Sequence, residues 1–414
     1  MNFKNLSLIF ALLSLKVFAN PIDDVVLSDL ETLDVEVSDN DIATVKVEDS
    51  ILEDEENSYS EVETEIPVIP EVPEVPVNSD LPCSNFESCA ELMMIYKDFM
   101  ISYGITGELL QQAISNYSDE KSEILKQKFD AINYGIKVDV NGHNMSVNIA
   151  GEQNSKTIVL LPALGIISPV IFYKDFVKSL SSDFKVITVE PFGYGASDYV
   201  EERRTNENIV SELHILLQKL GVDQFYLMAH SIGGIYSAAY ANEYPEEVLG
   251  FIGLDNTPTS FDDYVPNIIP DMAMPLMKVL DHYHINAFLP DDFANQKIAE
   301  EELYQTFSEE DKAILKIIID YKFINQNKID ESNLSGVNVA ATKGLYFQCP
   351  LLMFTSTETE NVMQEQLNAS WKGLHDAMVT QPDTSDVIMV ESTHGFIQAQ
   401  QKDFISNKIK EWIN

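Results

Sequence analysis

Basic residues are scarce in this sequence of 414 residues. It has 26 lysines and arginines against 67 aspartates and glutamates, which gives a formal net charge of -41 at pH 7. Nucleic-acid phosphates are bound mainly by Lys and Arg, so this charge balance argues against a nucleic acid as partner. The sequence also lacks an uninterrupted apolar run of about 20 residues, the length that a membrane-spanning helix needs. We therefore expect no stable membrane span in the processed protein.

Cysteine is also rare, with three residues in the whole chain. Cys83 and Cys89 lie close together, so a disulfide between them would close a short loop and leave Cys349 unpaired. A zinc site needs about four ligands. No second cysteine pair accompanies the first, and His282 and His284 form only a local pair. We expect neither a metal nor another cofactor.

The first 19 residues have the pattern of a secretory signal peptide. Lys4 precedes the apolar stretch Leu6–Leu15, and Val17-Phe18-Ala19 supplies a small residue at the expected cleavage point. This pattern predicts that the protein is secreted or extracytoplasmic. A retained signal anchor is the alternative.

Residues 20–82 are predicted to be an acidic, disordered tail with a proline-rich linker. Between Asp23 and Asp80 the only basic residue is Lys46, and a segment of such charge cannot bury enough apolar surface to fold. The tract Ile66–Pro76 carries prolines at short intervals, which favours an extended spacer. A processed pro-segment or a docking arm is the alternative to a plain solvated spacer.

Two further regions follow the linker. Residues 83–133 have apolar residues at helical spacing and are interpreted as a helical N-terminal extension. Residues 134–414 form the predicted main domain. It opens with two strands, Ile136–Val140 and Asn144–Ile149, joined by Asn141-Gly142, a pair that provides the positive φ of a two-residue hairpin turn.

Strand and helix patterns then alternate along the main domain, which predicts a doubly wound, mostly parallel sheet of α/β class. The alternation pauses after Pro258 and resumes at Pro350, and we interpret the helical stretch at about 260–346 as an inserted cap. The predicted strands of the alternating part are Thr157–Leu161, Lys185–Val189, Gln224–Met228, Leu249–Leu254, Leu351–Phe354 and Val387–Val390.

The segment Ala229-His230-Ser231-Ile232-Gly233 has the pattern of a nucleophile elbow. A serine on a sharp strand-to-helix turn needs very small residues two positions before and after it, because the chain is crowded there. Alanine and glycine occupy these two positions. The pattern therefore indicates that Ser231 is a nucleophile.

Three more motifs occur at matching places. Pro162-Ala163-Leu164-Gly165 follows the third strand, Gly193-Tyr194-Gly195-Ala196-Ser197-Asp198 follows the fourth, and His394 follows the last. With the elbow, these motifs resemble the α/β-hydrolase fold family, and within it the serine hydrolases, over about two thirds of the chain. The resemblance implies an α/β-hydrolase fold. Members that resemble dehalogenases and epoxide hydrolases have an aspartate at the elbow, where this chain has Ser231.

The resemblance and the residue chemistry together assign candidate roles. Ser231 would attack a carbonyl carbon while His394 takes its proton, and His230 is interpreted as a support residue. The acid that orients His394 belongs between them in the chain order of this fold. Asp255, at the end of a strand, is our first choice.

Two alternatives for the acid, Glu360 and Glu358, follow the strand that carries it in many family members. An oxyanion hole would use the backbone N–H groups of Leu164 and Ile232, both aimed at the developing negative charge. Pro162 replaces the family's usual histidine in the first of these turns.

The sequence therefore predicts a secreted serine hydrolase that cleaves an ester, amide or thioester through an acyl-enzyme. Its partner would be a small-molecule, ester-like substrate with a hydrophobic acyl group. The methionine-containing segment Ile268–Met277 could provide an adaptable wall for that group. The alternatives are a non-catalytic binding module of the same fold, and lyase or cofactor-free peroxidase chemistry on the same scaffold.

Overall fold

The computed structural model describes residues 89, 105–116, 119–264, 274–300 and 302–414. The predicted signal peptide, acidic tail and proline-rich linker lie outside these residues, as does most of the segment Ile268–Met277. All the described residues belong to one compact unit of the chain and lie in its stretch from Leu81 to Asn414.

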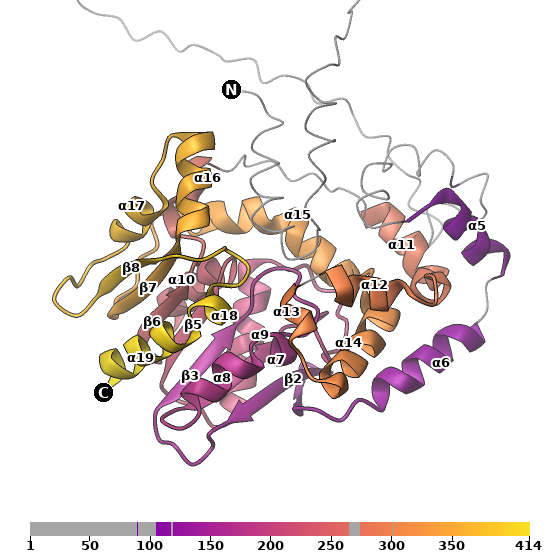
Figure 1. The fold of residues 1–414 in the computed structure, drawn as a ribbon, viewed down its shortest axis with the longest axis horizontal. Helices are drawn as coiled ribbons and strands as arrows, with labels where there is room; N and C mark the ends of the chain where they lie inside the picture. The colour runs from indigo at the N-terminus through magenta and orange to yellow at the C-terminus, as the bar shows by residue number, and fades with distance from the viewer. Residues whose placement is uncertain (1–88, 90–104, 117–118, 265–273, 301) are drawn as a thin grey trace, which may run out of the picture. The chain divides into compact units, whose positions relative to one another are not determined.

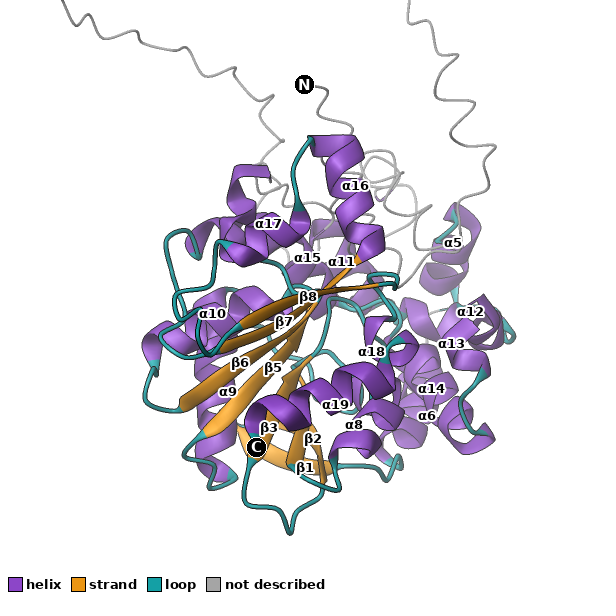
Figure 2. Ribbon diagram, turned by 60° about the vertical axis from the view of Figure 1, so that its left-hand side comes forward, coloured by secondary structure: helices purple, strands orange, loops and turns teal. Residues whose placement is uncertain are grey.

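A twisted sheet runs through this unit (Figure 2). Within the described residues it has eight strands in the order β1-β2-β4-β3-β5-β6-β7-β8. β1 and β2 pair antiparallel, β2 pairs antiparallel with β4, and all later pairings are parallel. The predicted doubly wound, mostly parallel sheet is confirmed. The strands are β1 Ile136–Val140, β2 His143–Ala150, β3 Thr157–Leu161, β4 Lys185–Glu190, β5 Phe225–His230, β6 Val248–Leu254, β7 Leu351–Ser356 and β8 Asp386–Val390.

The predicted hairpin between β1 and β2 is also confirmed. Asn141 and Gly142 occupy its turn with φ angles of 56° and 88°. Two consecutive positive φ values are what a type I′ turn requires, and Asn-Gly accepts them with little strain.

Helices cover both faces of the sheet. α8 and α19 pack on one face, and α9 and α10 pack on the other (Figure 2). Alternate residues of the central strands point to opposite faces, so Ile158 and Leu160 join one apolar core while Val159 and Leu161 join the other. The helices outside the cap are α5 Gly107–Ser115, α6 Asp119–Asp130, α7 Pro169–Phe172, α8 Lys174–Leu180, α9 Asn206–Lys219, α10 Gly233–Glu243, α16 Thr357–Leu367, α17 Trp371–Asp376, α18 Ile397–Gln400 and α19 Lys402–Ile413.

The segment between β6 and β7 is helical where the structure describes it (Figure 1). We call residues 259–341 of this segment the cap. Helix α6 of the N-terminal extension packs against cap helix α14, and the rings of Phe129 and Tyr321 lie 4.7 Å apart between centroids. The cap helices are η1 Thr259–Tyr264, α11 Met274–His282, η2 Ile285–Phe288, α12 Phe293–Glu300, α13 Glu302–Gln305, α14 Glu309–Lys322 and α15 Gln326–Ala341.

Most strands differ from the prediction by one or two residues at an end, and the end of β7 is the difference that bears on the candidate acids. β7 continues to Ser356, two residues past the predicted end at Phe354, and α16 begins at once with Thr357. Ser356 is the N-cap of α16, because its side chain accepts a hydrogen bond from the Thr359 N–H. Glu358 therefore lies in the first turn of a helix and not in a loop after the strand.

Two of the three cysteines lie in the described part of the chain. Cys89 is disulfide-bonded, and Cys349 is a free, buried thiol; Cys83 lies outside the described residues. In the described ranges no group of three or more His, Cys, Asp or Glu side chains is arranged to hold a metal ion. No helix in those ranges is long and apolar enough to cross a membrane.

Candidate active site

Ser231 lies on a sharp turn between β5 and α10. Its φ angle is 54°, a left-handed conformation that is uncommon for a residue with a side chain. The chain around it is crowded, since a methyl group on Gly233 would come within 3.0 Å of the Pro162 carbonyl oxygen and 3.2 Å of the Ala229 side chain. This crowding explains why both positions carry small residues, and it places the elbow against the turn after β3.

The side chain of His394 meets Ser231. His394 lies in the loop between β8 and α18, and its Nε2 is 2.9 Å from the Ser231 Oγ. Both side chains are buried, with exposed fractions of 3% for the histidine and 6% for the serine. A neutral imidazole that donates through Nδ1 can accept the serine proton at Nε2.

Asp255 forms a hydrogen bond with the other ring nitrogen of His394. The Nδ1 of His394 is 2.7 Å from the Asp255 Oδ2. The same carboxylate accepts hydrogen bonds from the backbone and hydroxyl of Ser356, from Thr359 Oγ1 and from Trp371 Nε1, at 2.6 to 2.8 Å. Burial alone would raise the pKa of Asp255, but the hydrogen bonds from His394, Thr359 and Ser356 outweigh it and lower that pKa well below its usual value. The carboxylate is thus held ionised against the imidazole.

The two alternative acids have other partners. The carboxylate of Glu358 accepts the backbone N–H of His394 at 2.9 Å, so it fixes the loop rather than the ring. Glu360 accepts hydrogen bonds from the Lys372 N–H at 2.8 Å and from Gln364 Nε2 at 2.6 Å. Of the three candidates from the sequence, the structure brings Asp255 to the imidazole.

The turn after β3 has its backbone fixed on both sides of Leu164. The Ala163 N–H donates to the Tyr173 hydroxyl at 3.2 Å, and the Gly165 N–H donates to the Tyr194 hydroxyl at 3.0 Å. These anchors shape the turn without the family's usual histidine.

The two predicted oxyanion donors are the N–H groups of Leu164 and Ile232. Neither has a hydrogen-bond acceptor among the residues that the structure describes. Leu164 follows Pro162 in the turn that packs against the elbow, and Ile232 directly follows Ser231. Neither N–H group is therefore used by another group in the described part of the chain.

His230 supports the site and is not a second base. Its Nε2 is 2.8 Å from the His394 carbonyl oxygen, which can only accept, so Nε2 carries a proton. Its Nδ1 then accepts from the Tyr173 hydroxyl at 2.9 Å. Burial, together with the neighbouring His394, lowers the pKa of His230 to about 3, so its ring stays neutral at physiological pH. The ring links the turn after β3 to the loop that carries His394.

Sequence reasoning missed the residues that hold these groups in place. Tyr173, Tyr194, Ser356 and Trp371 each donate or accept a hydrogen bond in the site. Only Tyr194 lies within a motif that the sequence singled out, the loop after β4. No local pattern distinguishes the other three from ordinary buried residues.

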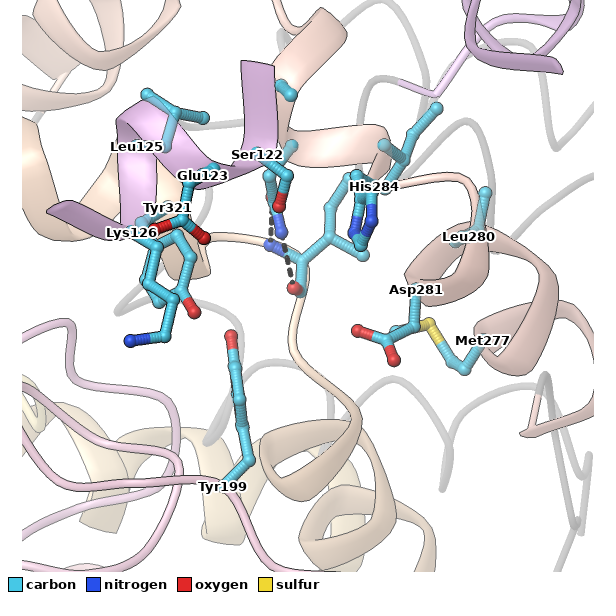
Figure 3. Close-up of a pocket in the computed structure, with 14 residues that line it drawn as sticks. Ser122, Glu123, Leu125, Lys126, Tyr199, Met277, Leu280, Asp281, His284 and Tyr321 are labelled. Carbon is cyan, nitrogen blue, oxygen red and sulfur yellow. Dashed lines mark hydrogen bonds between the residues drawn. The ribbon is translucent and has the colours of Figure 1, made fainter. Parts of the chain in front are cut away.

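A separate cavity of about 400 Å³ lies between α6 and the cap (Figure 3). Lys126 of α6, Tyr199 of the loop after β4, and Asp281 at the end of α11 are among the residues that line it. None of Ser231, Asp255 and His394 lines this cavity. It is therefore not the space in which the elbow serine would meet a substrate.

Comparisons with known proteins agree with this fold. A family model described as the alpha/beta hydrolase fold matches residues 156–279. The uncharacterised protein YbdG of Bacillus subtilis is 26% identical over 288 residues, which cover 67% of this chain and 85% of that protein. The 3-oxoadipate enol-lactonase 1 of Acinetobacter baylyi is 29% identical over 94 residues, 23% of this chain; the match spans only 34% of the lactonase.

Among solved structures, a mutant of a Pseudomonas aeruginosa protein described as an epoxide hydrolase superposes with a TM-score of 0.51. It is 13% identical and covers 67% of this chain and 96% of its own. At this identity the likeness concerns the fold alone. With the strand order, the elbow and the matched family model, this likeness shows that the chain has the α/β-hydrolase fold.

Proposed function

We propose that this protein is a serine hydrolase that cleaves a carboxylic ester, or an amide or thioester, through an acyl-enzyme on Ser231. The observation that carries the proposal is the hydrogen-bonded series from Ser231 Oγ to His394 Nε2 at 2.9 Å and from His394 Nδ1 to Asp255 Oδ2 at 2.7 Å. A base within hydrogen-bonding reach of a hydroxyl, itself oriented by a third group, is the arrangement that activates a serine.

Each residue then has one task in the reaction. Ser231 Oγ attacks the carbonyl carbon while His394 Nε2 takes its proton, and Asp255 stabilises the imidazolium that forms. The Leu164 and Ile232 N–H groups bind the oxygen that becomes negative. His394 next gives its proton to the leaving group, which departs and leaves Ser231 acylated. A water molecule, deprotonated by the same imidazole, releases the acid and restores the serine.

The proposed substrate is a small ester with an apolar acyl group. Leu164 and Ile232, whose N–H groups would bind the carbonyl oxygen, belong to the apolar core on one face of the sheet. Phe172 and Phe396, whose rings lie 6.3 Å apart, pack in or against the core on the other face, and Phe396 lies two residues after His394. Apolar walls with a few convergent polar groups are typical of sites for such substrates.

We also propose that the protein acts outside the cytoplasm, after removal of residues 1–19. The disulfide bond of Cys89 supports this, because disulfides persist mainly in oxidising compartments.

Aspartate-dependent chemistry on the same scaffold is not favoured. The branch of the family that resembles epoxide hydrolases has an aspartate at the elbow, whereas this chain presents the Ser231 hydroxyl to a histidine. A non-catalytic binding module is also less favoured. The strand after the cap, β7, carries no acid that contacts His394, but Asp255 at the end of β6 does.

A panel of p-nitrophenyl esters of increasing acyl length tests the proposal. The wild-type protein should release nitrophenol from at least one ester, and Ser231→Ala should reduce kcat/KM by about 10⁵-fold or more. Equal rates for the two proteins, both folded by thermal melting, would contradict the proposed function.

A further inference from the structure

A buried carboxylate of the cap is connected to the turn that carries Leu164. The Gly165 N–H donates to the Tyr194 hydroxyl at 3.0 Å, and this hydroxyl donates to Glu331 Oε2 at 2.7 Å. Glu331 lies on cap helix α15. Two hydrogen bonds therefore join Gly165, in the turn after β3, to Glu331, which lies more than 160 residues later in the chain.

These groups are sealed from water. The exposed fractions of Tyr194 and Glu331 are 1% and 5%. A buried polar group that loses its partner has no water to replace it, so both bonds are strongly preferred once the cap is in place. Burial raises the pKa of the Glu331 carboxyl, and the Tyr194 hydrogen bond, the guanidinium of Arg204 and Lys328, one turn earlier on α15, only partly oppose that rise.

The Glu331 carboxylate also binds a second tyrosine, Tyr236, which has no hydrogen bond to the turn after β3 among those of the described residues. The Tyr236 hydroxyl donates to Glu331 Oε1 at 2.9 Å. Tyr194 and Tyr236 are both buried and each gives one hydrogen bond to the same side chain. They differ in one respect, since only the hydroxyl of Tyr194 also accepts the Gly165 N–H.

We propose that Glu331 is a positioning residue, through which the seated cap fixes the Leu164 N–H in the direction that an oxyanion needs. The catalytic consequence rests on the proposed function. Leu164 lies between two anchored residues, Ala163 and Gly165, and Gly165 has a φ of 82°, where glycine leaves the backbone unusually free. Without Glu331 on α15, the Tyr194 hydroxyl has no acceptor to fix its direction, so the anchor that it gives the Gly165 N–H is less well ordered. The proposed hole is thus best ordered with the cap docked.

Amide hydrogen exchange across residues 162–168 tests the connection without any need for activity. Tyr194→Phe should speed exchange in this segment by roughly 10-fold, because the Gly165 N–H loses its acceptor. Tyr236→Phe is the matched control and should leave the segment at the wild-type rate. Equal exchange in the two variants, whether both fast or both slow, would overturn the proposal.

A second pair of variants tests the contribution of the cap. Glu331→Gln should also speed exchange in residues 162–168. Asp330→Asn is its control, because the neighbouring Asp330 binds Arg203 and the Arg204 N–H but not the turn. If the control alone loosens the turn, general cap docking matters and Glu331 does not. Should Glu331→Gln fail to fold, Glu331→Asp, which keeps the charge but shortens the side chain, takes its place in the same comparison.

Turnover separates this inference from the proposed function. Tyr194→Phe should lower kcat on a nitrophenyl ester by roughly 10- to 100-fold with little change in KM, as expected when a group that acts in the transition state is misplaced. Tyr236→Phe should keep kcat within about 3-fold of wild type. A wild-type protein without activity would end the proposed function, whereas the exchange rates would still report on Glu331 and the turn.

Discussion

Asp255 and His394 are joined by a 2.7 Å hydrogen bond, although one follows β6 and the other follows β8. β7 lies between these two strands in the sheet. Its last residue, Ser356, donates both its N–H and its hydroxyl to the carboxylate, at 2.8 and 2.7 Å. The strand between them thus holds the acid in the position from which it orients the imidazole.

The first prediction concerns this acid. Asp255→Asn should lower kcat on a nitrophenyl ester by about 10⁴-fold, because an amide can favour the wrong tautomer of His394 and cannot stabilise the imidazolium. Glu360→Gln serves as the control and should stay within about 3-fold of wild type. The reverse ranking of the two variants would show that the acid lies on α16.

The second prediction concerns pH and stability. The folded pKa of His230 is lowered to about 3 by burial and by His394, while an unfolded histidine titrates near 6.5. Between these values the unfolded chain binds a proton that the folded protein does not, so stability falls as the pH drops from about 6.5. This residue should cost on the order of 2 kcal/mol between pH 7.5 and pH 5.

Urea unfolding of wild type and His230→Gln at the two pH values measures that cost. The loss of stability between pH 7.5 and pH 5 should be smaller in the variant by about 2 kcal/mol. The buried His375, whose pKa is also lowered chiefly by burial, is present in both proteins and cancels from the comparison. The same pH dependence in both proteins would mean that His230 is protonated in the folded state.

The third prediction concerns the loop after β4. Gly195 has a φ of 44°, and a methyl group there would come within 2.1 Å of the Glu190 carboxylate. Gly221 has a φ of 65° and open space around the same position. Gly195→Ala should therefore lower the free energy of unfolding by about 3 kcal/mol or more, and Gly221→Ala by only about 1 kcal/mol. Similar losses in the two variants, measured by urea unfolding, would show that no clash occurs at Gly195.

The fourth prediction concerns the free cysteine. Burial raises the pKa of the Cys349 thiol to about 12 and leaves it 8% exposed. Because the thiolate is the reactive form, alkylation by iodoacetamide at pH 8 should be roughly 1000-fold slower in the native protein than in urea. Mass spectrometry of the peptide that contains Cys349 measures both rates. Fast modification of the native protein would place this thiol at the surface.

Much of the fold could be predicted from the sequence, because its signals are local. Strands such as Thr157–Leu161 are nearly all apolar, as is typical of strands buried on both faces. Local sterics also explain Asn141 and Gly142, which adopt the positive φ of the hairpin turn. They explain the small residues on either side of Ser231, where the chain is crowded. The end of β7 was misplaced, since Thr355 and Ser356 have no apolar signature, although Ser356 is a good N-cap for the helix that follows.

The supports of the site could not be predicted in this way. Tyr173 meets His230, and Trp371 meets Asp255 across 116 positions of sequence. Such contacts depend on how the helices pack on the sheet, and a buried tyrosine or tryptophan has the same sequence signature wherever its polar atom points. The choice of Asp255 over Glu360 rested on reach between neighbouring strand ends, which the sheet order then provides.

The most direct test of the account is covalent labelling of Ser231. A fluorophosphonate should form one adduct per folded molecule, on the peptide that contains Ser231, and Ser231→Ala should form none. His394→Ala should slow labelling by several orders of magnitude, because the hydroxyl then has no base within reach. A folded wild-type protein that stays unlabelled, or an adduct at another residue, would contradict the claim that Ser231 and His394 form a working nucleophile and base.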